Sequence, residues 1–265
     1  MALVHTAHIV CASLLGGLAV TRDAWDAFWH RVPHNQRLLK EDAKEYVKNL
    51  AALIPLTPGL RVLDFGCGWG NVARLLGPQV GELCLWDDAP RMRRLAAETV
   101  TGLENVRMLD LDTNSDPSTL PVFDLILINS VAQFMTAQEL AHWLRRWRHM
   151  LAQEGHIVVS DLVPPDYPAA ADLITLLRFS ASRGFLARAL YDAARVMPLY
   201  HRTRRARPLL RTSHDQLTRW GSDAAWEVRG FPRNLTCFRK RITAVYGHAR
   251  RAESDVVFQR QRPGW

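Results

Sequence analysis

One short segment of the chain combines an acidic residue with three evenly spaced glycines: Val62-Leu63-Asp64-Phe65-Gly66-Cys67-Gly68-Trp69-Gly70. An apolar run precedes the glycines and a helical pattern follows them, which predicts a strand-to-helix turn. Glycines let the backbone of such a turn approach a ligand closely. The dinucleotide fingerprint G-x-G-x-x-G fails because position 71 is Asn, whereas D-x-G-x-G-x-G fits throughout. For the glycines taken alone, a plain tight connection is the alternative.

Acidic residues also follow two later apolar runs. Asp87 comes directly after 82–86, and Asp110 comes after 105–109. A carboxylate at the end of the second strand can accept hydrogen bonds from both hydroxyls of a ribose, as it does in dinucleotide-binding folds. Asp88 is adjacent and competes for this role, for which we prefer Asp87.

Together these features resemble the class I S-adenosylmethionine-dependent methyltransferases. The resemblance covers about residues 58–161 and, through a terminal hairpin, 220–246. It implies an α/β fold with a Rossmann-like, seven-stranded sheet that is mostly parallel and has an antiparallel last strand. It also implies S-adenosyl-L-methionine as the cofactor.

The resemblance further implies roles for single residues. Asp110, or its competitor Asp112, would take the adenine amino group, with the backbone of Leu111 facing the ring. Asn129, at the end of the fourth strand, would lie beside the methionine moiety. The candidate cofactor-binding residues are Asp64, Gly66, Cys67, Gly68, Gly70, Asp87, Asp88, Asp110, Leu111 and Asn129.

Hydrophobic periodicity predicts the elements that must position these residues. Strands are expected at 61–65, 82–86, 105–109, 123–129 and 156–160, with helices at 71–76, 90–99 and 138–151. This alternation predicts a parallel sheet covered on both faces. Later, a long helical pattern at 169–197 leads into an arginine-rich loop, a helix at 215–220 and strands at 226–230 and 236–246. The link between these two strands is too short for a crossover helix, so they should be antiparallel.

These elements divide the chain into four parts. Residues 1–57 form an N-terminal helical lid or arm, and 58–161 with 213–250 form the methyltransferase core. Residues 162–212 form a helical, arginine-rich insertion that we expect to build the acceptor region, and 251–265 form a tail. Trp25, Phe28 and Trp29 recur at helical spacing, which suits either core packing or a lid over the ligand.

The positive charge lies in the second half of the chain. The net charge is +8, and residues 1–150 carry 15 basic and 16 acidic side chains, against 19 and 10 in residues 151–265. No acid lies between Ala193 and His214, but six arginines do: Arg195, Arg202, Arg204, Arg205, Arg207 and Arg211. Such a stretch suggests an anionic partner, namely a phosphorylated or lipid-linked small molecule, a membrane surface or nucleic acid. A solvated surface is the alternative.

Composition excludes several classes of protein. Hydrophobic residues make up 48% and charged residues 23%, which is typical of a globular chain and not of a disordered or fibrous one. The four cysteines are scattered along the sequence, which argues against a disulfide framework and against a cysteine zinc site. We therefore expect the protein to reside in the reducing cytoplasm. The first twenty residues are largely apolar but carry no positive charge before the apolar run, which argues against a secretory signal. We expect them to form an arm that packs on the body of the protein, with peripheral membrane contact as the lesser alternative.

The chemistry expected is an in-line methyl transfer that the protein assists by alignment and desolvation. We expect no metal, because Asp161 is the sole acid directly after the fifth strand. Asp161 leaves that strand on the ligand side, which makes it the candidate general base for a hydroxyl acceptor. Its alternative role is to cap a helix or accept a backbone hydrogen bond.

The function predicted is therefore O-methylation of a small-molecule acceptor. The segment after the fourth strand reads Asn129-Ser130-Val131-Ala132 and lacks the Asn/Asp-Pro-Pro-aromatic tetrapeptide typical of amino-methylating enzymes that act on nucleobases. Two alternatives stay open: an RNA or protein methyltransferase that grips its substrate with the 195–211 arginine stretch, and a catalytically silent methyltransferase-like partner subunit. The sequence leaves the acceptor and the oligomeric state undetermined.

Overall fold

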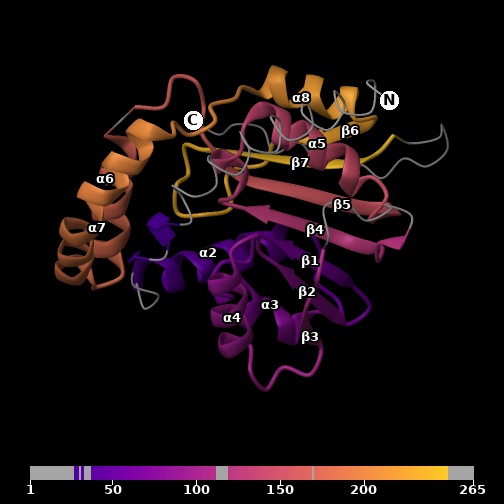
Figure 1. Ribbon diagram of the computed structural model, residues 1–265, viewed down its shortest axis with the longest axis horizontal. Helices are drawn as coiled ribbons and strands as arrows, with labels where there is room; N and C mark the ends of the chain where they lie inside the picture. Colours follow the sequence, from indigo (N-terminus) through magenta and orange to yellow (C-terminus); the bar gives the residue numbers. More distant parts are fainter. Residues whose placement is uncertain (1–26, 30, 33–36, 112–118, 169, 250–265) are drawn as a thin grey trace, which may run out of the picture.

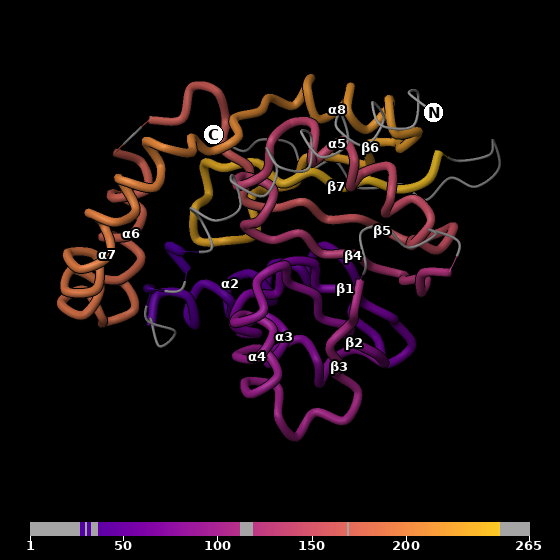
Figure 2. Tube along the Cα trace, in the orientation of Figure 1, coloured from indigo at the N-terminus to yellow at the C-terminus, as the bar shows by residue number. Residues whose placement is uncertain are grey.

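A seven-stranded sheet forms the centre of the computed structural model (Figures 1 and 2). The structure describes residues 27–29, 31–32, 37–111, 119–168 and 170–249. The strands are β1 (Arg61–Phe65), β2 (Glu82–Trp86), β3 (Val106–Met108), β4 (Phe123–Asn129), β5 (Leu151–Leu162), β6 (Trp226–Gly230) and β7 (Ile242–His248). Their spatial order is β3-β2-β1-β4-β5-β7-β6. The first five run parallel and β7 is antiparallel to both neighbours, which confirms the Rossmann-like fold.

Helices cover both faces of the sheet (Figure 1). They are α2 (Arg37–Leu53), α3 (Asn71–Leu76), α4 (Pro90–Thr99), α5 (Ala137–Trp147), α6 (Ala171–Ser182), α7 (Leu186–Ala206) and α8 (His214–Asp223). In β4, Leu125 and Leu127 pack with α2, α3 and α4, whereas Ile126 and Ile128 pack with α5 and α8. Successive side chains of a strand point to opposite faces, so each face of the sheet has its own core.

Several predicted boundaries match the structure and others do not. The predicted bounds of β1, β2, β4, β6, α3 and α4 are confirmed. The predicted helix to 151 ends at Trp147, and β5 already begins at Leu151. The last strand begins at Ile242 instead of 236, because Asn234 and Thr236 are drawn into a buried hydrogen-bond network. The arm over the first twenty residues, Trp25, Asp112 and the tail 251–265 lie outside the described residues.

The insertion differs most from its prediction. The long helical pattern divides at Gly184, whose φ of 69° ends α6 and turns the chain into α7. The prediction of an arginine-rich loop after Met197 is wrong, because α7 continues through Pro198 to Ala206. Packing overrides the loss of one helical hydrogen bond at the proline: Leu199 and Tyr200 lie on a cluster with Phe28, Trp69 and other apolar residues. The two helices project from the sheet as a hairpin (Figure 1).

A buried ion pair closes the end of β5. Asp161 accepts hydrogen bonds from Arg241 Nη1 at 2.7 Å, Ser130 Oγ at 2.9 Å and Thr236 Oγ1 at 3.1 Å. Arg241 also donates to Asp172 Oδ2 of α6 at 2.8 Å. Both members of the pair are buried, and Asp161 has a φ of 69°, in the left-handed region. The network therefore joins the loop after β4, the bulged end of β5, the start of β7 and the insertion.

Replacing Arg241 by Met should lower the free energy of unfolding by about 3 kcal/mol or more, because it leaves Asp161 buried without its positive partner. Arg107→Met removes the exposed ion pair with Glu82 and is the matched control, with an expected change below about 1 kcal/mol. Urea unfolding followed by circular dichroism measures both. Equal losses in the two variants would contradict this account of the network.

No helix in the described part of the chain is long and apolar enough to span a membrane.

Candidate functional site

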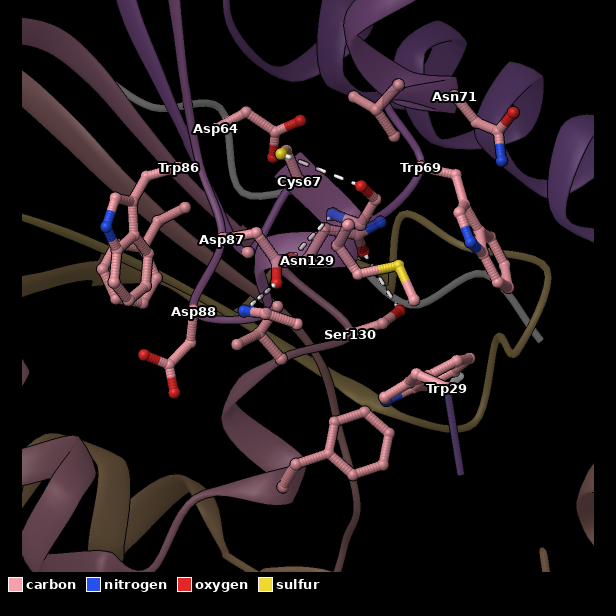
Figure 3. Close-up of a pocket in the computed structure, with 18 of the residues that line it drawn as sticks. Trp29, Asp64, Cys67, Trp69, Asn71, Trp86, Asp87, Asp88, Asn129 and Ser130 are labelled. Atoms are coloured by element: carbon pink, nitrogen blue, oxygen red, sulfur yellow. Dashed lines mark hydrogen bonds between the residues drawn. The ribbon is translucent and has the colours of Figure 1, made fainter. Parts of the chain in front are cut away.

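A cavity of about 490 Å³ opens at the carboxyl ends of β1, β2 and β4 (Figure 3). The glycine turn and the loops after β2 and β4 form one side of it, where Asp64, Cys67, Asp87 and Asn129 are seen in Figure 3. Trp29 lies on the other side, next to Trp69 of the glycine turn. In an open α/β sheet this edge is where ligands bind.

The structure brings together most of the residues that the sequence singled out. Those that line the cavity are Asp64, Gly66, Cys67, Gly68, Asp87, Asp88 and Asn129. Gly70 instead packs against α4, where an added Cβ would lie 3.1 Å from the Ala96 Cα. Asp110 is exposed and Leu111 is buried in the core beneath α5, and neither belongs to the lining. Their adenine-binding roles stay predictions.

Asp87 is held by the two loops that flank it. Its carboxylate accepts the Gly68 N–H and the Ala89 N–H, each at 2.9 Å. Burial raises its pKa, against the opposing effect of these two amides. Arg93 donates to the Asp87 carbonyl at 2.7 Å and so fixes the loop from behind. Asp88 is exposed, which favours Asp87 as the carboxylate presented to a ligand in fixed geometry.

Asp64 is a buried acid at the start of the turn. Its Oδ2 has no hydrogen-bond partner among the residues that the structure describes. Burial, and then the negative charge of Asp87, raise the pKa of Asp64 to about 7. A nearby cation stabilises the ionised form of a buried carboxylate that lacks a hydrogen-bond partner. The site therefore favours a positively charged ligand group.

Gly68 leaves room for a ligand. Its φ is 54°, and an added Cβ would meet no atom within 4 Å, because it would point into open space beside the cavity. The backbone can therefore be approached closely at this position. Neighbouring Cys67 is buried, and burial with the charges of Asp64 and Asp87 raises the pKa of its thiol. The thiol is thus kept neutral and is a poor nucleophile.

Asp161 lies behind the cavity and is absent from its lining. Ser130 does line the cavity, and its hydroxyl donates to Asp161 Oδ2 at 2.9 Å. Ser130 has a φ of 59°, an unusual conformation that the network around Asp161 holds in place. The geometry therefore favours a positioning role for Asp161, and its assignment as the general base stays a prediction.

Sequence reasoning missed Asp42 of α2. This residue lines the cavity, and its Oδ1 accepts the Cys237 N–H at 2.6 Å. Burial raises its pKa to about 6, against the effect of that hydrogen bond. An acid with this pKa can accept a proton near neutral pH. No local signal marks Asp42, because its partner is 195 positions away in the sequence.

An aromatic wall closes the other side of the cavity. The Trp29 ring meets Trp69 at 5.7 Å and Phe134 at 5.8 Å between centroids, both edge to face. The buried Trp69 N–H has no hydrogen-bond partner among the described residues. Trp29 therefore packs on a hydrophobic cluster and also lines the cavity, and its role in a lid stays a prediction. Arg207 adds a positive charge to the lining.

No group of three histidine, cysteine, aspartate or glutamate side chains in the described ranges is placed to hold a metal ion. Metal independence stays a prediction.

Comparisons with known proteins agree with this geometry. The model of a methyltransferase domain matches residues 63–157. A curated relative, the biotin biosynthesis bifunctional protein BioCD of Bordetella avium, is 30% identical over 169 residues, which are 56% of this chain and 36% of the relative. The chain thus spans about a third of the length of that relative.

Solved structures share the fold at low sequence identity. Magnesium protoporphyrin IX methyltransferase from Synechocystis PCC 6803, with bound SAH, has a TM-score of 0.51 at 14% identity and covers 84% of this chain and 91% of its own. The pyocyanin biosynthetic protein PhzM has a TM-score of 0.58 at 15% identity, and the match covers 91% of this chain and 67% of PhzM. The family model thus identifies a methyltransferase domain within residues 63–157, and the solved structures show that the chain has the Rossmann-like methyltransferase fold.

Proposed function

We propose that this protein transfers a methyl group from S-adenosylmethionine to a small-molecule acceptor, at a hydroxyl group and without a metal. The observation that carries the proposal is the Asp87 carboxylate, held by the Gly68 and Ala89 amides at the edge of a cavity that adjoins the glycine turn. Two fixed oxygens at the end of β2 suit the two hydroxyls of a ribose.

The residues present fit the rest of the cofactor. Asp64, with its unpartnered oxygen, suits the cationic amino group of the methionine moiety, and the open backbone at Gly68 allows close approach. Asn129 lies in the lining where the methionine moiety is expected. We assign the adenine to the side of Asp110 and Leu111 on the family resemblance. When bound, the cofactor supplies an electrophilic methyl group on a sulfonium.

The other side of the cavity suits the acceptor. Trp29 and Phe134 offer an apolar wall that excludes water, and Arg207 suits an anionic substituent. Asp42 is the acid in this lining that we propose as the proton acceptor for a hydroxyl. In this proposal Asp161 is a positioning residue that acts through the Ser130 hydroxyl, which donates to its Oδ2, and Asp42 replaces it as the general base.

Asp87→Ala should weaken binding of S-adenosylhomocysteine at least about tenfold, because it removes hydrogen bonds to a charged acceptor. Asp88→Ala is the control, since Asp88 is exposed and adjacent, and it should change the affinity little. Isothermal titration calorimetry measures both. If Asp88→Ala is the damaging change, the wrong acid has been chosen. No binding by the parent protein would favour the catalytically silent alternative.

Gly68→Val should abolish cofactor binding while the protein stays folded, because the side chain fills the space that a ligand would occupy. Gly102→Val is the matched control: Gly102 also has a positive φ with open space around it, but it lies outside the cavity. Both variants place a β-branched residue at a positive φ, so circular dichroism should show a loss of stability of similar size in each. Calorimetry should show cofactor binding only in the control. Retained affinity in Gly68→Val would place the ligand elsewhere.

Asp64→Asn should bind the cofactor more weakly at neutral pH and yet resist unfolding better than the parent. The parent acid has a pKa of about 7 when folded and an ordinary value of 3.8, so its ionisation destabilises the fold progressively as the pH rises from about 4 to about 7. The neutral variant is spared this loss. Its unfolding free energy relative to the parent should therefore rise over that range and then level off. A difference independent of pH would contradict the assignment.

A further inference from the structure

The hairpin of α6 and α7 carries nearly all of the large apolar side chains left exposed in the described residues. Six such residues are exposed by 36% to 54%, and five of them lie on the hairpin. These five are Leu173, Ile174, Leu186, Leu190 and Tyr191. The sixth, Val122, lies before β4. Single exposed apolar residues are ordinary, whereas a group on one projecting motif indicates an interaction surface.

The exposed residues of α7 form one continuous stripe. Six exposed residues follow one another at intervals of three or four positions, which places them on one side of the helix. They are Ala187, Leu190, Ala194, Pro198, His201 and Arg205. The inner side of the helix, with Val196, Leu199 and Tyr200, packs on the cluster around Trp69. The outer stripe is therefore exposed; it is apolar from Ala187 to Pro198 and ends in Arg205.

The hairpin also carries a strong positive charge. Residues 162–212 contain nine arginines and three aspartates and neither lysine nor glutamate. Two of the aspartates are already paired, Asp172 with Arg241 and Asp192 with Arg188. Arg202 and Arg205 are exposed and form no ion pair within the described residues. The surface thus combines aliphatic side chains with uncompensated positive charge.

We propose that the α6–α7 hairpin docks on an anionic lipid surface. Leu173, Leu190 and their neighbours would enter the boundary between headgroups and acyl chains, while Arg202 and Arg205 contact the headgroups. This combination is what an interfacial amphipathic helix requires, since apolar area and basic charge act together on the same membrane.

The charge argues against the other occupants of such a face. A symmetric contact between two copies would bring together two hairpins that each carry an excess of five positive charges over residues 171–206, which repel. Nucleic acid would engage the arginines but not the aliphatic side chains, because phosphates and bases bind to charges and aromatic rings. Only an anionic bilayer uses both halves of the surface.

The docking surface adjoins the cavity through one helix. The residue that follows α7 is Arg207, which lines the cavity. The proposal does not depend on methyl transfer, so each can fail without the other.

Sedimentation with lipid vesicles tests the proposal on the full chain. At low salt, the protein should pellet with vesicles made of equal parts phosphatidylcholine and phosphatidylglycerol and remain in solution with pure phosphatidylcholine. Arg202→Glu/Arg205→Glu should reduce the partition coefficient at least about tenfold, because each basic residue near an anionic surface contributes. Leu190→Ser should reduce it several-fold.

Matched controls separate the surface from general effects. Arg94→Glu/Arg145→Glu makes the same change in net charge at exposed positions of α4 and α5, and Val122→Ser removes the exposed apolar residue outside the hairpin. Both controls should sediment like the parent, and S-adenosylhomocysteine titration should show that all variants bind the cofactor. Sedimentation of the parent with neither vesicle, or equal losses in the controls, would overturn the proposal. So would a dimer in lipid-free light scattering that Leu190→Ser dissociates.

Discussion

The ion pair between Asp161 and Arg241 is the interaction on which the site depends most. Burying either charge without a partner would cost several kcal/mol, so each charge also needs hydrogen bonds from its surroundings. Ser130 and Thr236 donate hydrogen bonds to Asp161, and Asp172 accepts one from Arg241. Together with the ion pair itself, these partners come from four separate segments of the chain. The pair therefore fixes the loop after β4 at the cavity, and with it the conformation of Ser130 at a φ of 59°.

The cavity itself has the opposite character, because three of its acids, Asp42, Asp64 and Asp87, form no ion pair within the described residues. Asp64 and Asp42 lie in the lining with pKa values raised to about 7 and about 6, and in both cases burial is the main cause. Asp87 adds a third acid, held by backbone amides alone. The cost of burying these acids lowers the stability of the protein, and a cationic ligand would reduce that cost. Stability that is lost in this way favours binding of the ligand. A sulfonium donor with a cationic amino group has the complementary charge.

The two sides of the cavity have different origins. The side assigned to the cofactor is built from loops at the ends of β1, β2 and β4, whose positions follow from the sheet. The side assigned to the acceptor is built from Trp29, Asp42 and Arg207, which lie on or next to helices outside the sheet. These helices pack on the glycine turn through the cluster around Trp69. In the proposed assignment, the sheet loops thus keep the methyl donor while the helical parts select the acceptor.

The sequence by itself determined what depends on neighbours along the chain. The glycine turn, the acids at the ends of strands and the bounds of β1, β2 and β4 follow from short-range periodicity and turn chemistry. Tertiary structure decided whatever depends on distant partners. Asp42 meets Cys237 across 195 positions, Asp161 meets Arg241 across 80, and packing carries α7 through Pro198. Burial and compensation of charge arise only when such segments meet, so no local pattern contained them.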